Sequence, residues 1–384
     1  MAVKGRLLIN VFLAGLFFSS FIFLPKTALI YEIPRVWFIS IWIEVLIVLS
    51  LIFGWPHLRK RNVDGLLIFA VILYGLIAAA SVFSGVDPKK SFFGNYWRAD
   101  GVVTFLHLFG LFFFLTLFWD RRWEEKLAAA IGVAAFSNAA FAIGNGIVTQ
   151  TYPLIGTFGH PNFLAGYLVV SLPFIFFSFE KARSQDERAA WFVCALIVLL
   201  TIAVTGSVGG ILGIAVLCLT VILNKENVSR FRIIASLAVL AVIAGTVFLV
   251  VQKQTGFLPE GRERIFVRGV LAFSKKPVLG WGWANFDYAF KSVDWPMKYE
   301  FDKYVDKAHS SVLEALVTTG ILGFLAYLFI IGYALLRFVK DKRLPFYLFA
   351  AFLLFLIHSQ TNVISISEEL MFWLLLGIIA ARKA

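Results

Sequence analysis

One segment of the sequence, 253–309, holds most of the side chains that could do chemistry. It carries ten Lys and Arg residues, including Arg262, Arg264 and Arg268 within seven positions. A guanidinium group can donate two parallel hydrogen bonds to phosphate oxygens, and it stays charged near a membrane. Residues 262–273 have helical spacing, so the arginines predict a site for an anionic, phosphate-bearing substrate. An interfacial amphipathic helix whose arginines contact lipid headgroups fits the same pattern.

His309 is the candidate general base. It directly precedes an apolar run, and Ser310 or Ser311 could cap the helix that begins there. A neutral imidazole accepts the proton of an attacking hydroxyl at neutral pH. Asp306 or Glu314 would orient its ring. A histidine at the membrane interface with no catalytic role is the competing interpretation.

Two tryptophans follow the arginines within the turn-rich stretch 277–285. Trp281 and Trp283 alternate with Gly280 and Gly282, which permit tight backbone geometry. Indole rings stack on sugars, and they also gather in the headgroup belt of a membrane. We therefore expect Trp281 and Trp283 either to bind a glycan or to lie at the interface.

Two further polar motifs are expected on the same side of the membrane. The first, 156–167, contains His160 and Asn162 at the start of an apolar run. The second, 94–101, contains Arg98 just before the fourth predicted span. All three side chains are candidates for substrate binding. A turn that begins a helix explains His160 and Asn162 equally well.

The composition requires a bilayer as solvent for the rest of the chain. Hydrophobic residues make up 60% of the 384 positions, with 42 Phe and 11 Trp, more apolar surface than a soluble core can bury. Both cysteines, Cys194 and Cys218, lie in apolar runs, which argues against disulfides or a thiolate metal site. No zinc-type cluster, P-loop or Ser-His-Asp pattern is present. We expect chemistry that uses no metal and no cofactor.

The predicted fold is all-α: a polytopic membrane protein of about twelve transmembrane helices. Residues 1–384 would form a single membrane domain, and 253–309 would be a large extracytoplasmic loop between spans nine and ten that carries the active site. The seventh and eighth spans are short and could form a re-entrant pair. Apolar runs of near-spanning length occur at 7–24, 36–54, 65–84, 102–118, 127–148, 162–180, 190–205, 210–223, 233–252, 311–336, 346–360 and 366–381.

The charges of the connecting segments predict the orientation. The links expected inside carry twenty Lys and Arg, and the short links expected outside carry five. Because positive charge favours the cytoplasmic side, both termini should be cytoplasmic and the long loop should face outward. The same rule accounts for the net charge of +12 without nucleic acid as a partner. The run 7–24 is expected to be the first span rather than a cleavable signal.

Several motifs in this order resemble the O-antigen ligase and O-antigen polymerase family of bacterial membrane glycosyltransferases. They are Tyr96-Trp-Arg-Ala-Asp-Gly101, Gly156-Thr-Phe-Gly-His-Pro-Asn-Phe-Leu-Ala-Gly166, Gly261-Arg262, Pro277-Val-Leu-Gly-Trp-Gly282, Ala308-His309, Glu314 and Thr319-Gly-Ile-Leu-Gly323.

The resemblance implies a twelve-helix enzyme of cell-envelope polysaccharide biosynthesis in the bacterial cytoplasmic (inner) membrane. Its donor would be a glycan on undecaprenyl diphosphate, and its acceptor a hydroxyl of a lipid, glycan or protein. Arg262 matches the family's diphosphate-binding arginine, and His309 its catalytic histidine. Val208 stands where the family usually has Arg, so Arg98, Arg264 or Arg268 would have to replace that contact. Ser310 and Phe266 stand where Asn and Trp are common.

Other functions fit parts of the pattern. A polymerase of the same family would differ only in its acceptor, another lipid-linked repeat. A flippase or transporter for lipid-linked glycans would need charged residues deep in the spans, where Glu44 is an isolated acid. Val208 favours an inactive scaffold.

Overall fold

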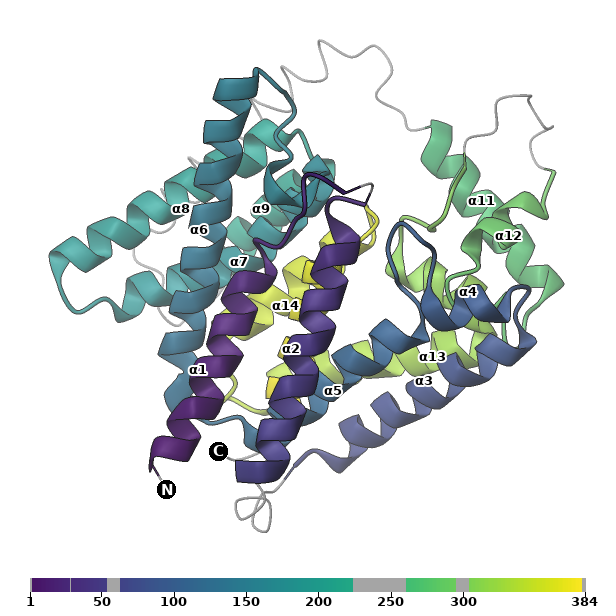
Figure 1. Cartoon of the computed structure of the whole chain (residues 1–384), viewed down its shortest axis with the longest axis horizontal. Helices are drawn as coiled ribbons and strands as arrows, with labels where there is room; N and C mark the ends of the chain where they lie inside the picture. The colour runs from purple at the N-terminus through teal and green to yellow at the C-terminus, as the bar shows by residue number, and fades with distance from the viewer. Residues whose placement is uncertain (1, 28, 54–62, 224–259, 295–303, 382–384) are drawn as a thin grey trace. The chain divides into compact units, whose positions relative to one another are not determined.

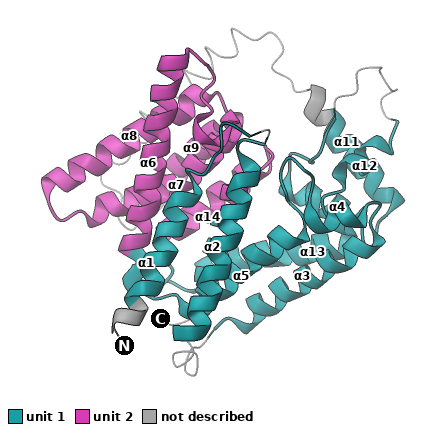
Figure 2. Cartoon of the chain, in the orientation of Figure 1, with its two compact units in different colours: residues 1–124, 260–344, 369–384 teal, residues 125–259, 345–368 magenta. Residues whose placement is uncertain are grey.

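The computed structural model describes residues 2–27, 29–53, 63–223, 260–294 and 304–381 (Figure 1). All regular secondary structure within these ranges is helical, which confirms the all-α prediction. The helices form two compact units (Figure 2). Unit 1 comprises 1–124, 260–344 and 369–384, and unit 2 comprises 125–259 and 345–368.

Unit 1 is built around two long helices and the helices that pack on them. Its elements are α1 (Ala2–Ser19), α2 (Glu32–Phe53), α3 (Gly65–Ser84), α4 (Pro88–Phe93), α5 (Val102–Phe118), η2 (Arg121–Trp123), α11 (Glu260–Lys275), α12 (Phe286–Lys291), α13 (Ser311–Lys340) and, from Glu369 onward, α15 (Ile366–Ala380). The two long helices, α3 and α13, pack along each other; α2 contacts both α1 and α5, and α11 contacts both α12 and α13.

Unit 2 is organised around α7, which contacts α8, α9 and α14. Its elements are α6 (Glu124–Thr149), η3 (Gly156–Phe158), α7 (Pro161–Lys181), α8 (Gln185–Thr205), α9 (Val208–Leu223) and α14 (Phe346–Ser359). The seventh span, expected to be short at 190–205, is longer in the structure, where it is helix α8. Ser184 caps it by accepting a hydrogen bond from the Glu187 N–H, so the helix begins earlier and has 21 residues.

Each predicted span except one coincides with a helix, and the exception, 233–252, lies outside the described residues. In the described part, six helices are long and apolar enough to cross a bilayer: α2, α3, α6 with η2, α7, α8 and α13. Shorter apolar helices occur in α1, α5, α9 and α14. The chain is a multi-pass membrane protein. The total of twelve spans, the single membrane domain and the placement of the loop remain predictions.

A break in α13 joins this helix to the turn that carries the tryptophans. Gly320 has φ 66°, outside the helical range. Carbonyls near this break accept hydrogen bonds from the turn: Trp281 N–H donates to Val317 O (2.9 Å), and Gly282 N–H donates to Thr318 O (3.0 Å). The turn thus satisfies backbone groups that the break removes from the helix.

Only glycine fits at this close approach. A Cβ at Gly320 would lie 2.2 Å from Val278 O, and one at Gly280, where φ is 70°, would lie 2.5 Å from the Thr318 carbonyl carbon. We expect Gly320→Ala to lower the free energy of unfolding by at least about 2 kcal/mol through backbone strain and the clash. Titration of detergent-solubilised protein with SDS measures this change.

Gly332 provides the matched control on the same helix. A Cβ there meets no atom within 4 Å, so Gly332→Ala should leave stability unchanged or raise it slightly, because alanine is the better helix former. Equal losses in both variants would contradict the account of the break.

Candidate active site

His309 lies in the turn directly before α13. Its φ of 55° is in the left-handed region, which a residue with a Cβ seldom adopts. Ser310 then caps α13, with its side chain accepting a hydrogen bond from the Leu313 N–H (3.2 Å). The imidazole is half-buried. The chain thus holds His309 in a strained conformation at the first turn of a candidate membrane span.

The two residues before His309 are anchored by half-buried charges. Lys307 Nζ forms ion pairs with Asp100 Oδ2 (2.5 Å) and Glu314 Oε1 (3.3 Å). The other carboxylate oxygen of Glu314 accepts a hydrogen bond from the Ala308 N–H (2.7 Å). Glu314, one of the two acids expected to orient the imidazole, contacts the preceding backbone and Lys307.

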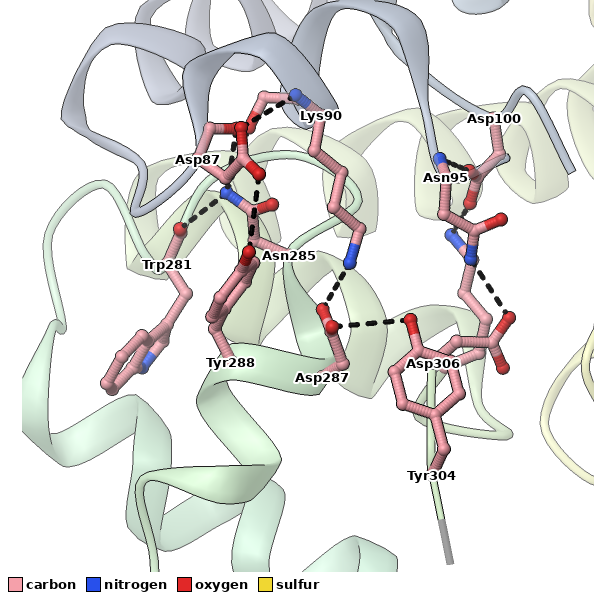
Figure 3. A network of polar contacts seen from close by, with 12 residues as sticks. Asp87, Lys90, Asn95, Asp100, Trp281, Asn285, Asp287, Tyr288, Tyr304 and Asp306 are labelled. Carbon is pink, nitrogen blue, oxygen red and sulfur yellow. Dashed lines mark hydrogen bonds and ion pairs between the residues drawn. The ribbon is translucent and has the colours of Figure 1, made fainter. Parts of the chain in front are cut away.

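A second ion pair connects the same turn to the loop between α4 and α5, since Arg98 Nε lies 2.7 Å from Asp306 Oδ2. Asn95 Nδ2, on the same loop, donates to that oxygen (3.3 Å; Figure 3). This loop is ordered by its own side chains. The side-chain oxygen Oδ1 of Asn95 accepts hydrogen bonds from the Trp97 and Arg98 N–H groups, both at 3.0 Å, and the Asp100 side chain accepts one from the Asn95 N–H. The predicted substrate ligand Arg98 therefore has a protein partner.

The charges of this network stabilise one another against burial. Burial alone would raise the pKa of Asp100, but the Lys307 ammonium and the Arg98 guanidinium hold it below its ordinary value. At Asp306, burial likewise raises the pKa, but the Arg98 guanidinium outweighs it and holds the pKa below its ordinary value. For Lys307, burial lowers the pKa, and the carboxylates of Asp100 and Glu314 more than reverse that change. All three groups are therefore ionised at neutral pH.

The lowered pKa of Asp100 and the raised pKa of Lys307 mean that the ion pair between them stabilises the fold at neutral pH. A carboxyl with a lowered pKa stabilises the fold above its ordinary value of 3.8, and that contribution is lost as pH falls through the folded pKa. A lysine with a raised pKa contributes below 10.5 and loses that contribution only as pH rises through its folded value. The stabilisation that wild type gains over Asp100→Asn from this carboxylate should thus be lost as pH falls below about 4. SDS titrations of both proteins from pH 7 down to about pH 3 test it, and a difference in unfolding free energy that does not shrink in acid would contradict it.

The arginines of the predicted phosphate site lie on α11, as the helical spacing of 262–273 indicated. Arg262 falls in its first turn, and its side chain lies outside the described residues. Arg264 is half-buried. Arg268 is only 1% exposed, with its guanidinium carbon 4.6 Å from the centre of the Phe290 ring. This cation–π contact joins α11 to α12.

Both predicted tryptophans point into unit 1. Trp281 is 9% exposed, and its Nε1–H donates to Ala272 O (2.8 Å). The Trp283 Nε1–H donates to Asp100 O (2.8 Å), and its ring packs 4.8 Å from that of Phe105. Trp283 thereby supports the loop that carries Asp100. The predicted binding of a glycan by these rings is not tested by these contacts.

His160 and Asn162 belong to unit 2. His160 caps α7: its Nδ1 accepts a hydrogen bond from the Asn162 N–H (3.2 Å), and Pro161 occupies the first helical position. The geometry is that of a helix-entry turn. Binding of substrate by these two residues remains a prediction.

Unit 2 also holds a buried acid–base cluster for which the sequence suggested no role. Glu368 Oε1 lies 2.6 Å from His358 Nδ1, and both side chains are 0% exposed. His358 Nε2 is 3.2 Å from Asn362 Nδ2. A Cβ at Gly166 would lie 2.1 Å from Glu368 Oε1, and one at Gly209 would lie 2.3 Å from Asn362 Nδ2. The early turns of α7 and α9 therefore pack directly on this cluster.

Sequence reasoning missed the partners that complete the network around His309. Asn95, Asp100 and Lys307 each stand beside a residue singled out earlier, but nothing in their local pattern shows which charges meet. Among the described residues, no group of three or more His, Cys, Asp or Glu side chains could hold a metal ion. Metal independence remains a prediction about the reaction.

Comparison with known proteins adds one match. Residues 192–328 match a family model described as O-antigen ligase, and no curated protein matches the chain. The matched region covers α9, α11, α12, Lys307, His309 and the first part of α13. The match includes the motifs from Gly261 onward and supports the O-antigen ligase and O-antigen polymerase family for this chain, in agreement with the resemblance.

Proposed function

We propose that the protein transfers a glycan from undecaprenyl diphosphate to an acceptor hydroxyl at the outer face of the bacterial cytoplasmic membrane. In the reaction, the acceptor oxygen attacks the anomeric carbon and the bond from that carbon to the diphosphate oxygen breaks. His309 takes the hydroxyl proton, and undecaprenyl diphosphate leaves with the bonding electrons. Both termini would be cytoplasmic, and the site would face outward.

Arg262 would stabilise the leaving group. Negative charge accumulates on the diphosphate as the glycosidic bond breaks, and a fixed guanidinium lowers the energy of that transition state. Arg264, on the same helix, is the nearest candidate in sequence for a second phosphate contact where the family arginine is replaced by Val208. Arg98 and Arg268 are less suited to this role, because one is paired with Asp306 and the other is stacked on Phe290.

One observation carries the proposal: His309 is held in a left-handed turn beside a half-buried charge network, inside the segment that matches the ligase family. Strained backbone in a non-glycine residue is characteristic of functional sites, because the surrounding contacts must maintain it.

Reconstitution tests the proposal. Purified protein in proteoliposomes should form a new glycosidic bond between an undecaprenyl-diphosphate oligosaccharide and an added hydroxyl acceptor, at the same rate in EDTA. A product extended by another lipid-linked repeat would identify a polymerase. Release of the glycan onto a different carrier would identify a ligase.

Two other classes give different results in the same assay. A flippase would move intact donor between leaflets without a new bond, and a scaffold would do neither. The contact of Glu44 disfavours the transporter: its Oε1 lies 2.9 Å from Nε2 of His107, so this acid has a polar neighbour on α5. Absence of any transfer with all acceptor classes would overturn the proposed function.

A further inference from the structure

We propose that Lys307 and Asp100 are positioning residues that hold His309 in its reactive orientation. The proposal rests on the function proposed above and adds two residues to it. Neither side chain is assigned contact with substrate. Their action would pass through the backbone of the turn at 306–310.

The first argument is the strain at His309. A left-handed conformation in a residue with a Cβ is strained and relaxes unless neighbouring contacts oppose it. The α13 side of the turn is fixed by the Ser310 cap and by the hydrogen bond from the Glu314 N–H to Ser310 O (2.8 Å). The other side precedes the helix, and its contacts include those of Asp306, Lys307 and Ala308.

The second argument is the geometry of the contacts on that side. Lys307 connects Asp100, on the loop before α5, to Glu314, in the first turn of α13. Glu314 also accepts the Ala308 N–H. Lys307 is thus the link between the loop and the helix, and it is one residue removed from His309. Rotation of the His309 peptide would require at least one of these contacts to break.

The third argument is the local charge. Lys307 faces the carboxylates of Asp100, Glu314 and Glu369, and the neighbouring Asp306 is paired with Arg98. Loss of the ammonium would remove the cation that joins Asp100 on the loop to Glu314 on α13. The loop and the start of α13 would then no longer be held together, which is the displacement that frees His309.

Lys307→Met tests the proposal in the proteoliposome assay. Because a general base displaced by about 1 Å loses much of its effect, we expect kcat to fall about 10- to 100-fold with KM changed little. Lys307→Arg, which keeps a cation between the two carboxylates, should restore most of kcat. Loss of stability alone would not separate kcat from KM or be rescued by arginine.

Lys90→Met is the matched control. Lys90 Nζ also lies 2.5 Å from an aspartate, Oδ1 of Asp287, and its side chain is 13% exposed compared with 19% for Lys307. The Lys90 pair lies in the adjacent network with Asp87 and Tyr288 (Figure 3). Its loss should lower stability without lowering kcat. An equal fall in kcat for Lys90→Met and Lys307→Met would overturn the proposal.

A readout that requires no turnover keeps this proposal separate from the proposed function. Diethyl pyrocarbonate acylates accessible imidazoles, and peptide mass spectrometry reports the rate at each histidine. His309 should react several-fold faster in Lys307→Met than in wild type, with exposed His160 unchanged. An unchanged His309 rate in folded protein would overturn the positioning role even if transfer is observed. If Lys307→Met does not fold, Asp100→Asn, which leaves Lys307 paired with Glu314, is expected to accelerate labelling in the same way.

Discussion

Replacement of His309 by alanine is expected to lower the rate of glycan transfer at least about 100-fold. The acceptor hydroxyl must lose its proton as the new bond forms, and alanine leaves only water to accept it. Arg262→Ala should reduce the rate by a similar factor for a different reason, because it removes positive charge from the departing diphosphate. Single-turnover transfer from a defined undecaprenyl-diphosphate oligosaccharide in proteoliposomes measures both effects.

The control for this prediction is another histidine of unit 1. His107 contacts Glu44 through Nε2, and His107→Gln keeps a hydrogen-bonding side chain there while it removes the titratable ring. This variant should retain wild-type transfer. Equal single-turnover rates in wild type, His309→Ala and Arg262→Ala would refute the assignment of both residues.

Loss of either partner in the His358–Glu368 pair is expected to lower the free energy of unfolding by about 3–5 kcal/mol. Both side chains are fully buried, so His358→Leu leaves the Glu368 carboxylate without its partner 2.6 Å away. Solvent cannot replace that contact, because Gly166 approaches the carboxylate closely. Titration of the purified protein with SDS, followed by tryptophan fluorescence, measures the loss.

Two variants sharpen this second prediction. His358→Leu with Glu368→Leu removes both polar groups and should be more stable than either single variant, since neither group is left buried without the other. Arg183→Ala breaks a pair with Glu125 in which the two side chains are 84% and 56% exposed, and it should cost no more than about 1 kcal/mol. A His358→Leu loss as small as that of Arg183→Ala would contradict the role assigned to the buried cluster.

The helices were accessible from the sequence because their signals are local. Apolar runs of spanning length predict α8 and α13 from neighbouring residues alone, and Ser310 was one of the two caps predicted for α13. The ends were less accurate, since α8 starts before its apolar run, at polar residues that hydropathy excludes. Helix α11 was indicated by the 3.6-residue spacing of its apolar positions.

The candidate site was only partly predictable. His309 stood out by its residue type and its position before a helix. Its supporting contacts did not, because Asp306 and Arg98 are 208 positions apart and meet only when α13 packs along α3 and the α4–α5 loop. The same packing turned Trp281 and Trp283 inward, where their N–H groups bond to backbone carbonyls.

By itself, the sequence determined the class of protein, the helices, and the residues able to do acid–base and phosphate chemistry. These follow from side-chain chemistry and from periodicity over a few turns. Only the tertiary structure decided which charges neutralise one another, and it joined Lys307 to Asp100 and His358 to Glu368. Coulomb energy in a low-dielectric interior depends on distances of a few ångströms, and those distances are set by helix packing that no local pattern encodes.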